Sequence, residues 1–166
     1  MGDPVLAQTA VPIISDNVDN LPLLIHDMID TMKAANGVGL AAPQIGLSLR
    51  IIVFEIPSDR LSEQEAKMTD GPQVLINPMI KTFNEEKELD WEGCLSIPGL
   101  RGEVPRHSSI EYTGLDGEGT KIEKMATGFH ARVIQHEIDH LDGILYPERM
   151  TDMRRFGFVE ELESNG

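Results

Sequence analysis

The segment Gln135-His136-Glu137-Ile138-Asp139-His140-Leu141 constrains how the rest of the chain must be arranged. It falls in a helix that the sequence predicts over residues 128–142, with Thr127 as N-cap and Gly143 at its end. Residues four apart on a helix share a face, so both imidazoles can reach one metal ion, and Glu137 flanks that face. An incidental amphipathic helix is the alternative, but burying two histidines without a partner is costly. The segment therefore predicts a metal site with a carboxylate beside it.

The segments that precede this helix predict an α+β fold. Apolar residues at three- and four-residue steps indicate an amphipathic helix over residues 21–36, ended by Asn36-Gly37. A polar loop is expected over residues 57–72. Strands are expected in these places: residues 50–56, residues 73–83 with Pro78 at an edge or bulge, and a hairpin of 110–115 and 121–125. Because the strands are followed by one late helix and do not alternate with helices, α+β is favoured over a parallel α/β sheet.

The length and charge of the chain exclude several classes of protein. Its 166 residues are expected to form a single domain over 1–166, with 148–166 as a C-terminal tail. The 14 basic and 28 acidic residues give a formal net charge of −14, which argues against non-specific binding to nucleic acid or anionic membranes. No apolar run approaches the ~20 residues that span a bilayer, and no secretory signal is visible. The single cysteine, Cys94, excludes an internal disulfide.

A catalytic metal site needs a third protein ligand besides His136 and His140. One known arrangement would need histidine at position 146, where the chain has Tyr146. Another takes a downstream glutamate, and the candidates are in the acidic tail: Glu160, Glu161 and Glu163. Cys94 is the remaining candidate, because a thiolate binds zinc and iron strongly, although most single cysteines are small buried hydrophobes. Spacing alone leaves this choice open.

Three separated segments resemble the peptide deformylases: Gly37-Val38-Gly39-Leu40-Ala41-Ala42-Pro43-Gln44, Glu92-Gly93-Cys94-Leu95-Ser96 and Gln135-His136-Glu137-Ile138-Asp139-His140-Leu141. They occur in the order and spacing of that family. The resemblance implies an α+β fold with antiparallel strands packed around a central metal-binding helix that carries HExxH, and with an N-terminal helix. It also implies one divalent metal ion held by Cys94, His136 and His140. The ion would be Fe2+ in the cell, and Zn2+, Ni2+ or Co2+ could replace it.

The resemblance further implies the reaction. A water molecule activated by the ion would attack the N-formyl group on the initiator methionine of a newly made polypeptide and release formate. The Gln44 amide and the backbone N–H of Leu95 would donate to the oxygen on which negative charge develops. Glu137 would take a proton from the water and pass it to the departing amine. Arg106 and Asp139 are implied as a pair that fixes helix and strand around the metal.

The substrate pocket is expected to use residues from two sources. The resemblance implies Val38, Gly39, Leu40, Gly93 and Arg101, and the helix face shared with His136 adds Phe129 and Val133. Arg132 stands where some members of the family have an aliphatic residue. It either changes the shape of the pocket or ties down a loop through an ion pair. No metal-ligand role is expected for the remaining histidines, His26, His107 and His130.

Two other functions compete with the deformylase hypothesis. One is a general HExxH metallopeptidase that uses a tail glutamate, and the other is a non-catalytic zinc-binding module, which would need four protein ligands. The expected partners are N-formyl-methionyl nascent peptides, with no membrane and no direct nucleic-acid binding. Docking on the ribosome through the acidic tail is not expected. The expected location is the bacterial cytoplasm, or an organelle after removal of a transit peptide.

Overall fold

The computed structural model describes residues 1–14, 18–66 and 71–164 of the protein. Its α-helices are α1 (Leu21–Ala34), α2 (Glu63–Ala66), α3 (Gly128–Leu141) and α4 (Val159–Ser164). Its strands are β1 (Gly39–Ala41), β2 (Ile51–Phe54), β3 (Gln73–Phe83), β4 (Lys87–Cys94), β5 (Ile97–His107), β6 (Ser109–Leu115), β7 (Lys121–Thr127) and β8 (Phe156–Phe158). Short 3₁₀ helices are η1 (Pro4–Ala7), η2 (Ala42–Ile45), η3 (Ser58–Arg60), η4 (Tyr146–Arg149) and η5 (Met153–Arg155).

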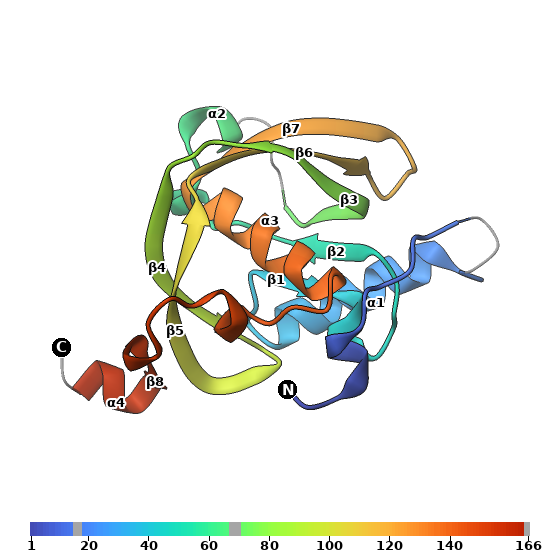
Figure 1. Cartoon of the computed structure of the whole chain (residues 1–166). Helices are drawn as coiled ribbons and strands as arrows, with labels where there is room; N and C mark the ends of the chain where they lie inside the picture. Colours follow the sequence, from blue (N-terminus) through green and yellow to red (C-terminus); the bar gives the residue numbers. More distant parts are fainter. Residues whose placement is uncertain (15–17, 67–70, 165–166) are drawn as a thin grey trace.

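In the described parts of the chain the strands form two antiparallel sheets. The larger has the order β1-β2-β3-β6-β7, and the smaller has the order β4-β5-β8. Figure 1 shows α3 in the middle of the molecule, surrounded by strands of both sheets. Helix α3 contacts β1, β2, β6 and β7 of the larger sheet and β5 of the smaller one. The helix that carries the histidine pair is therefore enclosed between the sheets.

Strand β2 lies between two apolar clusters. Its side chains are all buried, and successive side chains of a strand point to opposite faces. Ile52 belongs to the cluster that contains Ile134 of α3, whereas Ile51 belongs to the cluster that contains Met28 and Met32 of α1. A continuous apolar run can thus serve both faces of a sheet, with α3 on one face and α1 on the other.

The structure confirms the α+β class with antiparallel strands, and it refines several predicted elements. Helix α1 ends at Ala34, and Asn36 rather than Gly37 takes the left-handed conformation after it, with a φ of 54°. Pro78 lies within a register shift between β3 and β6, as expected for a bulge. Thr127 occupies the N-cap position of α3, but its hydroxyl donates to Glu65 instead of capping the helix.

Strands β4 and β5 of the smaller sheet were not predicted. The segment 87–94 is mostly polar and exposed, so β4 has no alternating apolar pattern. The segment 97–107 contains two prolines and two glycines, yet β5 pairs with β4 along most of its length. The expected loop over 57–72 contains η3 and α2, and the expected tail over 148–166 contains η5, β8 and α4. Backbone pairing with a partner strand, which local sequence does not report, accounts for β4, β5 and β8.

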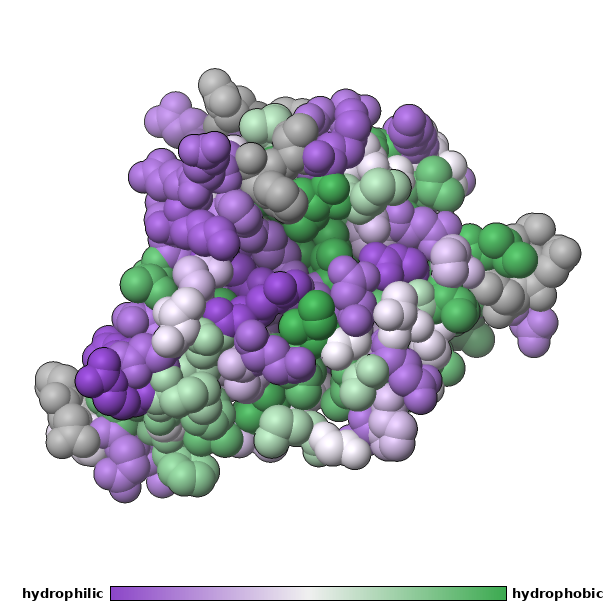
Figure 2. All heavy atoms as spheres, in the orientation of Figure 1, coloured by the Kyte–Doolittle hydropathy of each residue, from purple (hydrophilic) through white to green (hydrophobic). Residues whose placement is uncertain are grey.

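The polar surface agrees with the many charged residues in the sequence (Figure 2). On the face drawn in Figure 2, hydrophilic residues cover much of the area and hydrophobic residues appear in separate groups. Among the described residues, no helix is long and apolar enough to cross a membrane.

Candidate metal centre

Helix α3 presents His136 and His140 on one face. Their ring centroids are 5.0 Å apart, as expected for residues one helical turn apart. His136 Nδ1 lies 2.8 Å from a carboxylate oxygen of Glu92 and donates to it, so Nε2 is the nitrogen left to bind a metal ion. In His140 it is Nε2 that faces the sulfur of Cys94, at 3.2 Å. Both imidazoles therefore direct Nε2 toward the same space.

Cys94 reaches this space from the end of β4. Cys94 pairs with Ile97 across the two-residue turn Leu95-Ser96, whereas the preceding residue, Gly93, pairs with Arg101. This register shift interrupts the regular β4–β5 pairing, and such interruptions redirect the side chains beside them. The donor atoms of Cys94, His136 and His140 all lie within 4.8 Å of one another. Segments 42 or more positions apart in sequence thus bring three ligands together.

The chemistry of these three donors fits a divalent transition-metal cation. Imidazole and thiolate are ligands for iron, zinc, cobalt and nickel, whereas magnesium and calcium prefer oxygen. Burial opposes charge on His136, but Cys94 and Glu92 outweigh it and raise the pKa of His136 to about 10. Burial and the neighbouring His136 lower the pKa of His140 to about 3. The site thus attracts positive charge and offers a neutral imidazole, which suits a cation.

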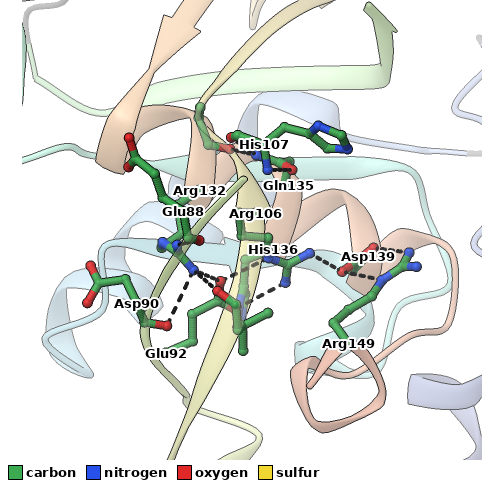
Figure 3. A network of polar contacts seen from close by, with 12 residues as sticks. Glu88, Asp90, Glu92, Arg106, His107, Arg132, Gln135, His136, Asp139 and Arg149 are labelled. Carbon is green, nitrogen blue, oxygen red and sulfur yellow. Dashed lines mark hydrogen bonds and ion pairs between the residues drawn. The ribbon is translucent and has the colours of Figure 1, made fainter. Parts of the chain in front are cut away.

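A buried polar network supports His136 from behind, as Figure 3 shows. The Glu92 carboxylate accepts from Arg106 Nε at 2.9 Å and Nη2 at 3.1 Å, in addition to His136. Arg106 Nη1 donates to Asp139 at 2.5 Å, and Arg149 donates two further hydrogen bonds to Asp139. Burial opposes ionisation of Glu92, but the hydrogen bonds from His136 and Arg106 hold its pKa well below the usual range. The Arg106–Asp139 pair therefore joins β5 to α3 directly beneath the histidines.

Glu137 lies beside the three donors and is largely shielded from solvent. It is 4% exposed, and its Oε2 has no hydrogen-bond partner among the described residues. Burial raises the pKa of Glu137 to about 7. Its side chain lies against Gly39 of β1, where a Cβ would collide with Oε1. A carboxyl group with this pKa can both accept and donate a proton near neutral pH.

Gln44 lies beside the sulfur atom of Cys94. Its amide Nε2 lies 3.6 Å from Cys94 Sγ and 3.3 Å from Ser96 Oγ, and its Oε1 accepts from the backbone N–H of Ala41 at 2.8 Å. The 3₁₀ helix η2, which follows β1 directly, places Gln44 there. Leu95 follows Cys94 in the β4–β5 turn. The structure therefore brings Gln44 and the Leu95 backbone next to the sulfur ligand.

A cleft of about 970 Å³ opens over this centre. The predicted pocket residues that line it are Val38, Gly39, Gly93, Arg101, Phe129 and Val133. Leu40 is different, because its side chain is 2% exposed and packs in the apolar cluster with Met28 and Met32. Alternation along β1 turns Leu40 away from the side that Gly39 presents. Leu40 is thus the predicted pocket residue whose side chain the structure places in the apolar core.

Sequence reasoning missed several residues of the cleft. Glu92 was quoted only as part of a motif, yet it is the hydrogen-bond partner of His136. Arg60 of η3 lines the cleft and stacks over Phe129, with 4.4 Å from its guanidinium carbon to the ring centroid. Val159, at the start of α4, also lines the cleft. The two-residue spacing of Glu92 and Cys94 on one strand is the signal that could have identified Glu92.

The other histidines lie outside the three-ligand group. His26 is exposed and lies near Asp30 on α1. His107 Nδ1 lies 2.5 Å from the Asn84 carbonyl, and His130 Nδ1 lies 2.9 Å from Glu65. Among the described residues, the group that can hold one ion consists of Cys94, His136 and His140, without the tail residues Glu160 and Glu161. The side chain of Glu163 lies outside what the structure describes.

The chain is similar in sequence to known proteins along most of its length. The sequence model of the family described as "Polypeptide deformylase" matches residues 1–156. A relative named peptide deformylase 1, from Nitrosomonas europaea, is 50% identical over 163 residues, which cover 98% of this chain and 91% of the relative.

Solved structures give the same similarity. A crystal structure of a peptide deformylase from Synechococcus elongatus in complex with actinonin has a TM-score of 0.80 at 38% identity, covering 93% of this chain and 78% of that one. A class I type b peptide deformylase from Acinetobacter baumannii, crystallised with Met-Ala-Ser bound, has a TM-score of 0.79 at 36% identity. That similarity covers 90% of this chain and 94% of the other.

Proposed function

The chain belongs to the peptide deformylase family of hydrolases, and we propose that it removes the N-formyl group from the initiator methionine of newly made polypeptides. The observation that carries this proposal is the convergence of Cys94, His136 and His140 beside a cleft that Cys94, His136 and the buried Glu137 line. Residues 1–166 would act as one catalytic domain. The bacterial relatives and a thiolate ligand that is sensitive to oxidation support a reducing compartment such as the bacterial cytoplasm.

Cys94, His136 and His140 would hold one divalent ion. When bound there, the ion would polarise the formyl carbonyl and lower the pKa of a water molecule. We propose Fe2+ in the cell, with Zn2+, Ni2+ and Co2+ as substitutes, because all four accept thiolate and imidazole ligands. Glu92 would keep the His136 lone pair on Nε2 by accepting the proton of Nδ1.

Glu137 would move the proton of the reaction. A carboxylate oxygen of Glu137 takes a proton from the attacking water as the new carbon–oxygen bond forms. The same residue then donates this proton to the amine nitrogen as the carbon–nitrogen bond breaks, so that formate and a free methionine amino group are the products. A pKa of about 7 suits both steps near neutral pH.

Gln44 and Leu95 would stabilise the charge that develops on the formyl oxygen. The Gln44 carbonyl is already held by the Ala41 N–H at 2.8 Å, which leaves its amide N–H groups facing the centre. A donor fixed in advance costs no reorganisation when charge appears. The backbone N–H of Leu95 would be the second donor.

The cleft would take the methionine side chain and the residues that follow it. Phe129 and Val133 of α3 would form an apolar wall beside His136. Gly39 of β1 and Val38, which precedes β1, would also line the cleft. The structure of the Acinetobacter baumannii relative with bound Met-Ala-Ser supports a peptide occupant of this kind. A cleft of 970 Å³ is at the upper end of the ~300–1,000 Å³ typical of ligand pockets, which suits more than one residue.

Formate release from a formyl-Met-Ala-Ser peptide tests the proposal. Protein loaded anaerobically with Fe2+ or Ni2+ should release formate, and Glu137→Ala should lose this activity while still binding the metal. Cys94→Ala should lose the metal. A loaded wild-type protein that releases no formate would contradict the proposed function.

The same variants separate the alternative functions. A general metallopeptidase that uses a tail glutamate predicts that truncation after Pro147 abolishes metal binding, whereas the proposed site predicts that Cys94→Ala does so. A structural zinc site predicts four protein ligands. The group of three donors in the described residues supports an open coordination position instead.

A further inference from the structure

Arg132 is a buried arginine on α3, and the proposed mechanism gives it no role. It lies one helical turn before His136 and is 6% exposed. Its Nη1 donates to Glu92 at 2.8 Å and to the Val104 carbonyl at 2.8 Å, and its Nη2 donates to the Glu88 carbonyl at 2.7 Å. Nη1 also donates to the Asp90 carbonyl at 3.5 Å, so one guanidinium contacts a carboxylate and three backbone carbonyls.

These contacts connect the elements that supply the metal ligands. Glu88 and Glu92 belong to β4, which ends at Cys94, and Val104 belongs to β5. Arg132 itself is on α3 with His136 and His140. Figure 3 shows the Arg132 guanidinium directed at Glu92, whose carboxylate also faces His136.

Arg132 acts on the metal ligand His136 through Glu92, which contacts both residues. Glu92 Oε1 accepts from both Arg106 and Arg132, and its Oε2 accepts from Arg106 and His136. The carboxylate is thus held in one orientation from two sides while it directs His136 Nε2. Arg106 also donates to Asp139 on α3, whereas Arg132 also donates to the backbone of β4. Arg132 therefore adds direct contacts between the strand that ends in Cys94 and the helix that carries the histidines, beside the contact of His136 with Glu92.

We propose that Arg132 is a positioning residue of the metal centre, which sets the distance between the Cys94 strand and the histidine helix and fixes Glu92 against His136. This inference rests on the proposed function, because it assumes that the three donors bind one ion. Of the two roles expected for Arg132, these contacts support the ion pair, and Arg132 also lines the cleft. A planar guanidinium serves all these acceptors at once, and an ammonium group does not.

Co2+ titration of the full chain tests this role without relying on activity. Cobalt bound to a thiolate gives visible and near-ultraviolet absorption bands that report ligand geometry and affinity together. Arg132→Met removes the charge and all the hydrogen-bond donors. Arg132→Lys retains the charge but lacks the planar set of guanidinium donors. Arg50→Met is the matched control. Arg50 is a half-buried arginine that donates to the Leu141 carbonyl and Asp142 at the other end of α3, without contact to Glu92.

We expect Arg132→Met to weaken Co2+ binding by about 10- to 100-fold, which is the range for residues that support a metal ligand. Arg132→Lys should fall between Arg132→Met and the wild type and should shift the absorption bands. Arg50→Met should keep the wild-type bands and affinity. All titrations are made on protein shown by circular dichroism to be folded.

The outcomes separate the two proposals. Wild-type protein that binds no Co2+ through a thiolate would refute the proposed function. Wild-type binding with unchanged affinity and bands in folded Arg132→Lys and Arg132→Met would refute only the positioning role. If both variants fail to fold while Arg50→Met folds, Arg132 is a folding residue and the positioning role is equally refuted.

Discussion

The contact between Gly39 and Glu137 makes Gly39→Ala a direct test of where the proton-transfer group must lie. A Cβ built on Gly39 would lie 2.8 Å from Cδ and 2.9 Å from Cγ of Glu137, and closer still to Oε1. Gly39 is not among the glycines with positive φ, so alanine fits its backbone without strain. Gly39 also lines the cleft, so kcat at saturating substrate is the quantity that reports the displacement of Glu137.

The size of the displacement follows from these distances. Ordinary contacts of a Cβ begin at 3.4 Å, so Cδ must move by about 0.6 Å and Oε1 by more. Glu137 is 4% exposed, which leaves little room for its side chain to rotate elsewhere. Because a misplacement of about 1 Å can cost about 100-fold in rate, we expect kcat to fall by about 10- to 100-fold.

The assay is formate release from saturating formyl-Met-Ala-Ser by Co2+-loaded protein, with the Co2+ affinity measured in parallel. The affinity should stay at the wild-type value, since the added Cβ meets Glu137 rather than a ligand. Gly117→Ala is the control for the addition of a methyl group, because its Cβ would meet only ordinary contacts, 3.6 Å from Ile25 Cδ1. A kcat for Gly39→Ala within about twofold of the wild type would refute the reasoning.

Three further predictions concern the core, acid stability and the cleft. Ile134→Ala, at a fully buried position of α3, should lower the free energy of unfolding by about 2–5 kcal/mol in urea titrations, and a loss below about 1 kcal/mol would contradict the packing described. Burial opposes ionisation of Glu65, but hydrogen bonds from Ser62, Thr127 and His130 lower its pKa from 4.5 to about 2. The ionised form thus stabilises the fold above pH 4.5, and this stabilisation is lost as the pH falls toward 2. The difference in unfolding free energy between the wild type and Glu65→Gln should shrink over that range, and a pH-independent difference would contradict the assignment. Val159→Ser should raise KM for formyl-Met-Ala-Ser by about 3- to 10-fold with kcat nearly unchanged. A change in kcat alone would contradict a role of Val159 in substrate binding.

The sequence predicts those elements whose pattern is set locally. Helix α1 and helix α3 show apolar residues on one face, and the β6–β7 hairpin shows strand-forming runs around a glycine-containing turn. Their bounds differ from the expected ones by a few residues at most. The strands β4 and β5 escape prediction because their residues are mostly polar or helix-breaking, and each becomes a strand through the other.

The candidate site divides in the same way. The pair of histidines one turn apart and Glu137 between them follow from helical spacing. Cys94 does not, because 42 positions separate it from His136, and only the family resemblance joined them. The Arg132–Glu92 contact spans 40 positions and was equally invisible, although Arg132 itself was singled out as a departure. Contacts between distant segments are fixed by the packing of sheet against helix, which periodicity does not encode.

Helix α3 also explains how so polar a segment can lie at the centre of the molecule. Burying polar side chains costs free energy unless each is paired. Gln135 exchanges two hydrogen bonds with the backbone of His107, at 3.0 and 2.9 Å. Asp139 accepts from Arg106 and Arg149, and Arg132 donates to Glu92. These pairs tie the helix to both neighbouring strands of the smaller sheet.

The exceptions lie at the metal centre. Among the described residues, the buried side-chain atoms without a hydrogen-bond partner are Glu137 Oε2, His140 Nδ1 and Tyr146 Oη, and the Tyr146 ring stacks on His136 with centroids 6.2 Å apart. Burying a polar atom without a partner costs free energy. The fold pays this cost at the site where charge develops and protons move. On this argument, replacing Glu137 with a residue of similar shape that needs no partner, as in Glu137→Met, should raise the thermal stability of the metal-free protein while it abolishes formate release. A lower melting temperature than the wild type would show that the Glu137 carboxyl stabilises the fold. It would contradict the argument that this group is left unpaired at the expense of stability.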